Sequence, residues 1–274
     1  NHRPSGRPDH PSRLAGFGMR LKLEIAYHGG AFEGWQSQSA GNTIQDHLER
    51  AFADLCGCRI VVHGAGRTDS GVHAEAQCAH VDVDDDRLPL RAWTPALNAH
   101  LPEDIRVIEV SAADQNFHAR FSAKGKIYRY TVWNHPVMNP LLRDRAWHVP
   151  REIDQRRLRE ACALFTGRHD FAAFSLRRTK EPEQTIRTIS SIQAEIHGPQ
   201  IQLTFEGEGF LYKMVRMISA AIIRHSTGKV RLQDLKNGLQ DGAPTFGLVA
   251  PACGLSLVRV LYEDSNSQSE KVAA

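Results

Sequence analysis

The sequence predicts an α+β fold with two sheet-based lobes, and three observations carry this prediction. Several segments alternate apolar and polar residues with a period of two, which is typical of strands with one buried face. Other segments repeat apolar residues at helical spacing. Most of the strands follow one another through hairpins, and strands and helices mix in two halves of similar pattern. The two halves share this pattern without a repeat in the sequence itself.

The first half opens with the stretch MRLKLEIAY, residues 19–27, in which every second residue is apolar. A helix is expected over residues 42–55, with Asn42 or Thr43 placed to cap its first turn. The other elements expected in this half are strands at 59–63, 78–84, 105–111 and 125–133 and a short helix at 89–98.

The second half begins near residue 150 with a helix that Asp154 can cap and that ends before Gly167. The stretches TIRTISSIQAEIHG and QIQLTFEG predict a hairpin that turns at Gly198 and Pro199. A helix in FLYKMVRMISAAIIRHSTG and a closing strand in CGLSLVRVLY complete this half.

These elements place one lobe at residues 19–135 and the other at residues 136–262. Residues 1–18 are rich in Pro, Gly, Arg and Ser, and we expect a disordered N-terminal extension or tag there. Residues 263–274 are likewise expected to form a disordered tail.

The composition sets limits on the class of protein. Lys and Arg number 34 against 31 Asp and Glu, a net charge of +3 that neither demands nor excludes a nucleic acid. Five cysteines do not form the dense, even framework of a secreted disulfide scaffold, which favours a reducing cytoplasm. No apolar run is long enough to span a bilayer, so no membrane is expected as a partner.

The loop GAGRTDSGVHAEAQ, residues 64–77, concentrates polar chemistry between glycines. It does not fit a dinucleotide fingerprint, because Asp69 stands where the third glycine is needed and a strand follows in place of a helix. His73 and Glu75 form the His-x-Glu of zinc deaminases, but the partner Pro-Cys-x-x-Cys is absent. On its own, Asp69 is interpreted most simply as a turn residue that hydrogen-bonds its own backbone.

Two segments indicate RNA. Basic residues alternate with aromatic ones in NFHARFSAKGKIYRY, an arrangement that suits bases splayed out of their stack. The simpler alternative is a two-faced strand with buried tyrosines and solvated cations. A second basic stretch, SLRRTKEPEQT, is expected in a loop that can meet phosphates, or else is only a soluble loop. The RNA-binding candidates are Phe117, His118, Ala119, Arg120, Phe121, Lys126, Arg177, Arg178 and Lys180.

Two cations, Lys213 and Arg216, interrupt an otherwise apolar helix. A cation in such a helix is usually paired or extends its charged end to the surface. Asp69 is a carboxylate without another use and is therefore a candidate partner.

The stretches GRTDSGVHA, NFHARFSAKGKIYRY, GEGFLYKMVRMI and GLSLVRV together resemble the TruA family of tRNA pseudouridine synthases. YHGGAFEGWQSQ and ALNAHLPEDI are further family-like stretches in the expected order. The resemblance covers about residues 19–262, and Ser70 is a departure where many members carry Ala.

The resemblance implies two ferredoxin-like (RRM-like) lobes that share a continuous, largely antiparallel sheet, with helices on one side and a basic cleft between the lobes. It also implies isomerisation of uridine to pseudouridine in the anticodon stem-loop of tRNA, at positions 38, 39 and/or 40. No metal, nucleotide or redox cofactor is implied, and a homodimer is expected.

The resemblance also assigns roles within the site. Asp69 matches the catalytic aspartate, which acts on the ribose, and Arg216 matches the arginine that pairs with it. Tyr128 matches the residue that stacks on the target base and is a candidate acceptor of the C5 proton, while Leu255 packs on the other side of the base. Arg67 is the candidate to steady or replace the flipped nucleotide.

Two other functions remain open at this point. One is a catalytically silent tRNA-binding protein on the same scaffold, and a metal-dependent deaminase is a distant third. The joint presence of Asp69, Tyr128 and Arg216 favours the enzyme, because a retired site has no physical need for a buried ion pair.

Overall fold

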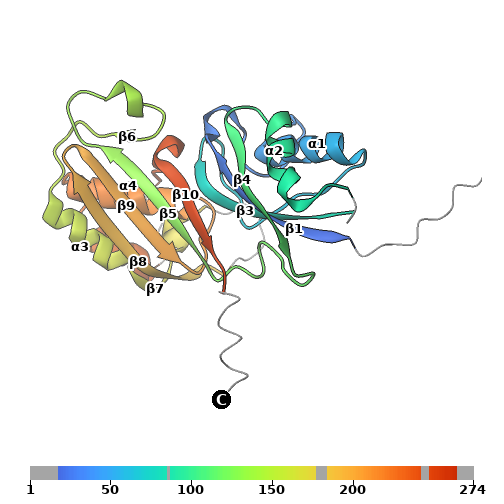
Figure 1. The fold of residues 1–274 in the computed structure, drawn as a ribbon. Coiled ribbons are helices and arrows are strands. Elements are labelled where there is room, and N and C mark those ends of the chain that lie inside the picture. Colours follow the sequence, from blue (N-terminus) through green and yellow to red (C-terminus); the bar gives the residue numbers. More distant parts are fainter. Residues whose placement is uncertain (1–17, 85–86, 177–183, 242–246, 264–274) are drawn as a thin grey trace, which may run out of the picture.

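The computed structural model describes residues 18–84, 87–176, 184–241 and 247–263, which form one mixed α+β structure (Figure 1). Its strands are β1 (Met19–Tyr27), β2 (His63–Gly64), β3 (His73–Val83), β4 (Ile105–Ala113), β5 (Gly125–Trp133), β6 (Trp147–His148), β7 (Gly167–Asp170), β8 (Ile186–His197), β9 (Gln200–Gly207) and β10 (Leu255–Leu261). Its α-helices are α1 (Ile44–Cys56), α2 (Leu90–His100), α3 (Gln155–Phe165), α4 (Met214–Ser226) and α5 (Leu232–Asp241).

All of these strands belong to a single sheet, in the order β4-β1-β3-β10-β5-β9-β8-β7, with β2 beside β3 and β6 beside β5. The closing strand β10 lies in the middle of this order, between β3 and β5 (Figure 1). It pairs with β3 in parallel, through Ser256 with His73, and with β5 in antiparallel fashion, through Leu257 with Tyr128. The C-terminal strand therefore joins the first half of the sheet to the second.

One buried face runs across the sheet from β1 to β9. Tyr27 pairs with Ala74, Ala74 with Leu257, Leu257 with Tyr128, and Tyr128 with Phe205, and all five side chains are buried. Because paired residues on neighbouring strands point to the same side, these side chains share one face. Apolar side chains of α1 to α5 join those of this face in a single hydrophobic cluster.

The sequence predicted most of these elements. β1 and β5 have the predicted bounds, because regular period-two alternation places one face of each strand in the core. Thr43 caps α1 through a reciprocal capping box with Asp46, and Asp154 accepts hydrogen bonds from two backbone N–H groups of α3. The hairpin of β8 and β9 turns at Gly198, whose φ of +57° lies in the left-handed region.

Several bounds differ from those predicted. Of the strand expected at 59–63, only His63 pairs with β3, as part of the short β2. The helix expected from residue 210 begins at Met214, because Lys213 takes a left-handed conformation with a φ of 59°. β6, β7 and α5 were not predicted. β5 pairs with β9 on one side and with β10 on the other.

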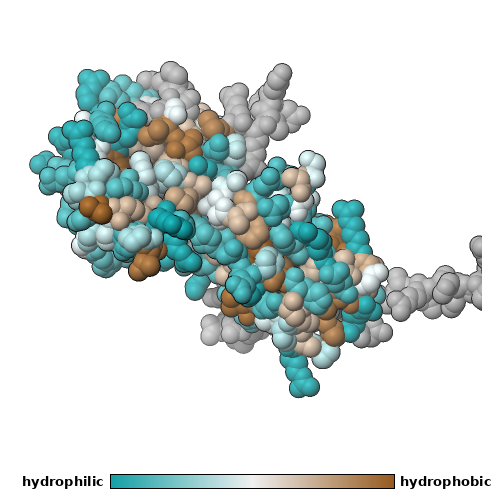
Figure 2. Space-filling view, turned by 90° about the horizontal axis from the view of Figure 1, so that it is seen from above, coloured by the Kyte–Doolittle hydropathy of each residue, from teal (hydrophilic) through white to brown (hydrophobic). Residues whose placement is uncertain are grey.

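The surface seen from above is mainly hydrophilic, with hydrophobic side chains in small separate groups (Figure 2). Among the residues that the structure describes, no helix has both the length and the apolar character needed to cross a membrane.

Candidate active site

Asp69 lies in the loop between β2 and β3, four residues before β3, the strand that pairs with β10. The backbone N–H of Val72 donates to the Asp69 carbonyl at 3.1 Å, which closes a turn that contains Gly71 with a φ of +79°. The simple interpretation of Asp69 as a turn residue is therefore correct for its backbone. Its carboxylate is engaged elsewhere.

The carboxylate of Asp69 forms an ion pair with Arg216 of α4. The two groups meet at 3.1 Å, Nη1 to Oδ2, and their side chains are only 15 % and 13 % exposed. The Nε of Arg216 also donates to the carbonyl of Ala250 at 2.8 Å, which fixes the orientation of the guanidinium. The pair joins a loop of the first half of the chain to a helix of the second, as proposed from the sequence.

A second loop of the first half supports the Asp69 loop through two glycines. A Cβ at Gly29 would lie 2.0 Å from the carbonyl oxygen of Val72, and one at Gly34 would lie 2.6 Å from that of Thr68. Only glycine permits these backbone approaches. The sequence analysis did not assign the glycines a role, although their stretch, YHGGAFEGWQSQ, was among the family-like ones.

The hydroxyl groups of Tyr27 and Thr68 hydrogen-bond at 2.8 Å, which ties the start of the Asp69 loop to β1. The backbone N–H of Trp35 donates to the carbonyl of Thr68 at 3.1 Å. Burial raises the pKa of Tyr27 to about 12, so its hydroxyl keeps its proton at neutral pH. These contacts leave the loop little freedom to move Asp69.

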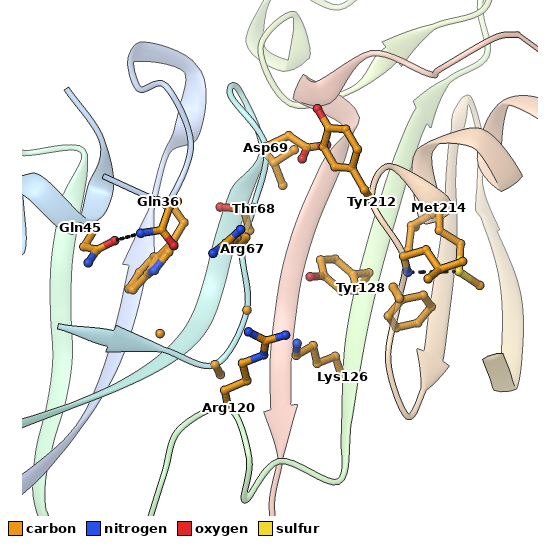
Figure 3. Close-up of a pocket in the computed structure, with 18 of the residues that line it drawn as sticks. Gln36, Gln45, Arg67, Thr68, Asp69, Arg120, Lys126, Tyr128, Tyr212 and Met214 are labelled. Atoms are coloured by element: carbon orange, nitrogen blue, oxygen red, sulfur yellow. Dashed lines mark hydrogen bonds between the residues drawn. The ribbon is translucent and has the colours of Figure 1, made fainter. Parts of the chain in front are cut away.

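A cleft of about 830 Å³ contains Asp69 and lies between the first and second halves of the sheet (Figure 3). Residues from the Asp69 loop, from β5, from the segment before α4 and from the start of β10 line it together. The predicted site residues among them are Arg67, Asp69, His118, Arg120, Phe121, Lys126, Tyr128, Arg216 and Leu255. The fold thus brings together residues that lie up to 188 positions apart, from Arg67 to Leu255 (255 − 67).

Tyr128 forms part of the wall of this cleft and belongs to the buried face of β5. Its ring meets that of Phe210 edge to face, with centroids 5.3 Å apart and an interplanar angle of 86°. Burial raises the pKa of Tyr128 above its usual range, so the neutral phenol is the favoured form. Leu255, buried at the start of β10, lines the same cleft. Phe210 was missed by the sequence analysis.

Cations dominate the charge of the cleft. Arg67, Arg120, Lys126 and Lys213 line it in addition to the paired Arg216, whereas Asp69 is the one carboxylate among its described lining residues. Burial, and to a smaller extent the charge of Arg120, lower the pKa of Lys126 to about 8.

Of the remaining RNA-binding candidates, the structure describes Phe117 and Ala119, and neither lines the cleft. Ala119 is fully buried, and its backbone N–H donates to Nδ1 of His80 at 3.1 Å. Phe117 packs against Tyr262, with ring centroids 5.2 Å apart. Arg177, Arg178 and Lys180 lie outside the described residues.

His73, half of the His-x-Glu pair, serves as a hydrogen-bonding link. Its Nδ1 accepts from the backbone N–H of Gly29 at 3.0 Å, and its Nε2 lies 3.0 Å and 3.1 Å from the carbonyls of Asp144 and Cys253. The ring is therefore a neutral imidazole with its proton on Nε2. In the described part of the chain, no group of three or more His, Cys, Asp or Glu side chains could hold a metal ion.

Comparisons with known proteins agree with this geometry. The family model described as tRNA pseudouridine synthase matches residues 25–122 and 161–263. The tRNA pseudouridine synthase A of Akkermansia muciniphila is 41 % identical over 260 residues, which cover 92 % of this chain and 98 % of that protein. The same-named protein of Bacillus licheniformis is 41 % identical and covers 90 % of this chain and all of its own length.

A third relative, the tRNA pseudouridine synthase A of Solidesulfovibrio magneticus, is 44 % identical over 255 residues, covering 89 % of this chain and 91 % of its own. Both the family model and these relatives extend through the loop of Asp69 and the helix of Arg216. The chain therefore belongs to the TruA family of tRNA pseudouridine synthases.

Proposed function

We propose that this protein isomerises uridine to pseudouridine in tRNA, with Asp69 as the catalytic carboxylate. The observation that carries the proposal is the ion pair of Asp69 and Arg216 within a cationic cleft. A paired arginine stabilises the charged form of a carboxylate that is largely shielded from water. Family membership supplies the reaction, and the geometry supplies the group that can perform it.

The reaction demands one ionised group beside the ribose. The N1–C1′ bond breaks, the uracil turns, C5 forms a bond to C1′, and the C5 proton leaves while N1 takes up a proton. Cleavage of a glycosidic bond builds positive charge on the sugar, which a nearby carboxylate stabilises. Asp69 can serve by attacking C1′ or by removing a proton from C2′, and both routes use the same oxygen atoms near the sugar.

The base must leave its stack before Asp69 can reach the sugar, at a cost of a few kcal/mol. Tyr128 and Leu255 provide ring and aliphatic surfaces in the cleft between which a uracil can lie. Arg67, two residues before Asp69, is placed to steady the extruded nucleotide. Because the phenol of Tyr128 holds its proton, stacking is its main role in this proposal.

The substrate site is the anticodon stem-loop, at positions 38, 39 and/or 40, and the working form is a cytoplasmic homodimer. We further propose that the two halves of the sheet are ferredoxin-like lobes and that the basic cleft between them receives the RNA. The cations that line this cleft support the last point, because phosphate contacts position a nucleic acid on a protein.

Tritium release from tRNA that carries 5-³H-uridine tests the function, because the C5 hydrogen is lost in every turnover. We expect release by the native protein in buffer with a chelator and none by Asp69→Asn. Asp54→Asn, the same change at an exposed position of α1, is the matched control and should release tritium normally.

Equal release by the native protein and Asp69→Asn would show that another carboxylate is responsible. Binding of tRNA by both proteins without release would instead support the catalytically silent RNA-binding protein. Detection of pseudouridine in the digested product confirms that the released tritium reports isomerisation.

A further inference from the structure

Lys126 occupies a position in the cleft that the isomerisation itself does not explain. It precedes Tyr128 by two residues on β5, so the two side chains share one face of the strand about 7 Å apart along it. In the view of Figure 3, Tyr128 lies between Asp69 above and Lys126 below. The ammonium is therefore on the far side of the stacking residue from the catalytic carboxylate.

Gly66 makes room for this ammonium. A Cβ at Gly66 would lie 2.7 Å from Nζ of Lys126 and 3.3 Å from its Cε. The carbonyl of Gly66 is held in turn by the side chain of Gln77, whose Nε2 donates to it at 2.9 Å. The lysine thus runs close over the backbone of the Asp69 loop, which directs its charged end into the cleft (Figure 3).

The charge of Lys126 has no compensation within the described residues. No carboxylate lies within ion-pair distance of it there, and its strand partners, Gly207 and Val260, carry no charge. The charged group that faces it is the guanidinium of Arg120, from the loop before β5 (Figure 3). Asp69 lines the same cleft but is paired with Arg216.

A largely buried cation beside another cation is unfavourable in the free protein. Such an arrangement becomes favourable when an anion enters the cleft, because the anion pairs with both cations. The positive potential of the cleft also stabilises the anion as it leaves water. RNA brings one phosphodiester for every nucleotide. The cleft therefore has a place for one backbone phosphate beside the extruded nucleotide.

We propose that the ammonium of Lys126, together with Arg120, binds the phosphodiester that flanks the target uridine and so places its ribose against Asp69. This inference rests on the proposed function and adds to it a specific anion site. Arg120 approaches from the opposite side of the site, so the phosphate would lie between the two cations (Figure 3).

The first experiment measures the salt dependence of tRNA binding in an Asp69→Asn background, which prevents turnover. Each lost phosphate contact reduces the slope of log Kd against log salt concentration by about 0.7–0.9. We expect this reduction for Lys126→Met and a preserved slope for Lys126→Arg, which keeps the charge. Lys236→Met, an exposed lysine of α5 outside the cleft, should leave the slope unchanged.

The second experiment follows Kd from pH 7 to pH 9.5 in the same background. With a pKa of about 8 in the free protein, the Lys126 ammonium must regain its proton to bind phosphate at higher pH. Binding should therefore weaken by up to about tenfold per pH unit above 8, and Lys126→Arg should remove this extra weakening.

Three results would overturn the inference. The first is a Lys126→Met slope equal to that of its parent, and the second is an identical pH profile for Lys126→Arg. The third comes from steady-state kinetics with an intact Asp69, where the proposal requires that Lys126→Met raise KM. A lowered kcat at unchanged KM would instead assign Lys126 to the chemistry. Tritium release by the native protein stands apart from all three, so a failure here leaves the proposed isomerase untouched.

Discussion

Arg216 reaches from the first turn of α4 to Asp69, 147 residues earlier in the chain, and the two charges meet at 3.1 Å. The pair connects the loop before β3 to α4 within the cleft. Because both side chains are largely buried, each charge depends on the other for its stability. The carboxylate that we propose as catalytic is therefore also one of the contacts between the two halves of the chain.

Removal of either partner should destabilise the protein strongly. We expect Arg216→Met to lower the free energy of unfolding by about 3 kcal/mol, because it leaves the Asp69 carboxylate buried and unpaired. The double variant Asp69→Asn/Arg216→Met should lose less than the sum of the two single changes. Urea unfolding measures all three, and Arg231→Met, which breaks an exposed pair with Asp234, should cost far less than either single change. Additive losses would contradict the coupling.

The support of the Asp69 loop can be tested at Gly29. Alanine there would place its Cβ 2.0 Å from the Val72 carbonyl, and the backbone must move because neither atom belongs to a flexible side chain. We expect a loss of about 1–3 kcal/mol in stability and a lower kcat, since Val72 lies three residues after Asp69. The matched control is Gly209→Ala, where a Cβ meets nothing within 4 Å. Equal effects of the two changes would exclude this supporting role.

His80 makes stability sensitive to acid. Burial and the neighbouring His118, His63 and Arg20 lower its pKa from 6.5 to about 4, while Asp82 acts in the opposite direction. As the pH falls, the unfolded chain therefore binds a proton at His80 before the folded protein does. The part of the free energy of unfolding that depends on this group is fully present above pH 6.5 and is lost between pH 6.5 and 4. We expect a loss of about 1–2 kcal/mol by pH 4.5 from this group.

His80→Asn should remove this part of the acid sensitivity, because the amide oxygen can still accept from the backbone N–H of Ala119 and does not titrate. Urea unfolding from pH 7.5 to 4.5 measures the effect. His197→Asn, at an exposed histidine, should leave the profile unchanged. A variant that loses as much stability as the native protein on acidification would place the sensitivity at another group.

Sequence patterns predicted the elements whose periodicity is regular and left out those that depend on distant partners. β1 and β5 alternate strictly, so the burial of one face follows directly from the sequence. Residues 60–62 are also apolar, yet they form no ladder, because pairing needs a free strand edge at the right place. α5 lies in a short segment that no pattern had singled out.

The site was predicted in the same uneven way. The resemblance placed Asp69, Tyr128 and Arg216 in one site, and the structure brings them to one cleft. Spacing alone could not have joined Asp69 to Arg216 across 147 residues. The close approach of Gly29 to Val72 was equally out of reach, because a glycine in a loop does not show which backbone passes beside it.

The charge of Lys126 should lower stability in the free protein while it serves binding. Its pKa falls from 10.5 to about 8 on folding, so the ammonium form is disfavoured in the folded state. Below pH 8 this penalty is fully present, and stability rises from pH 8 to 10.5, where the unfolded chain holds more protons than the folded one. Lys126→Met should therefore stabilise the protein at pH 7 by at most about 3 kcal/mol and by progressively less towards pH 10.5.

Urea unfolding of both proteins across this range measures the difference. A variant less stable than the native protein at pH 7 would contradict a net penalty from this charge.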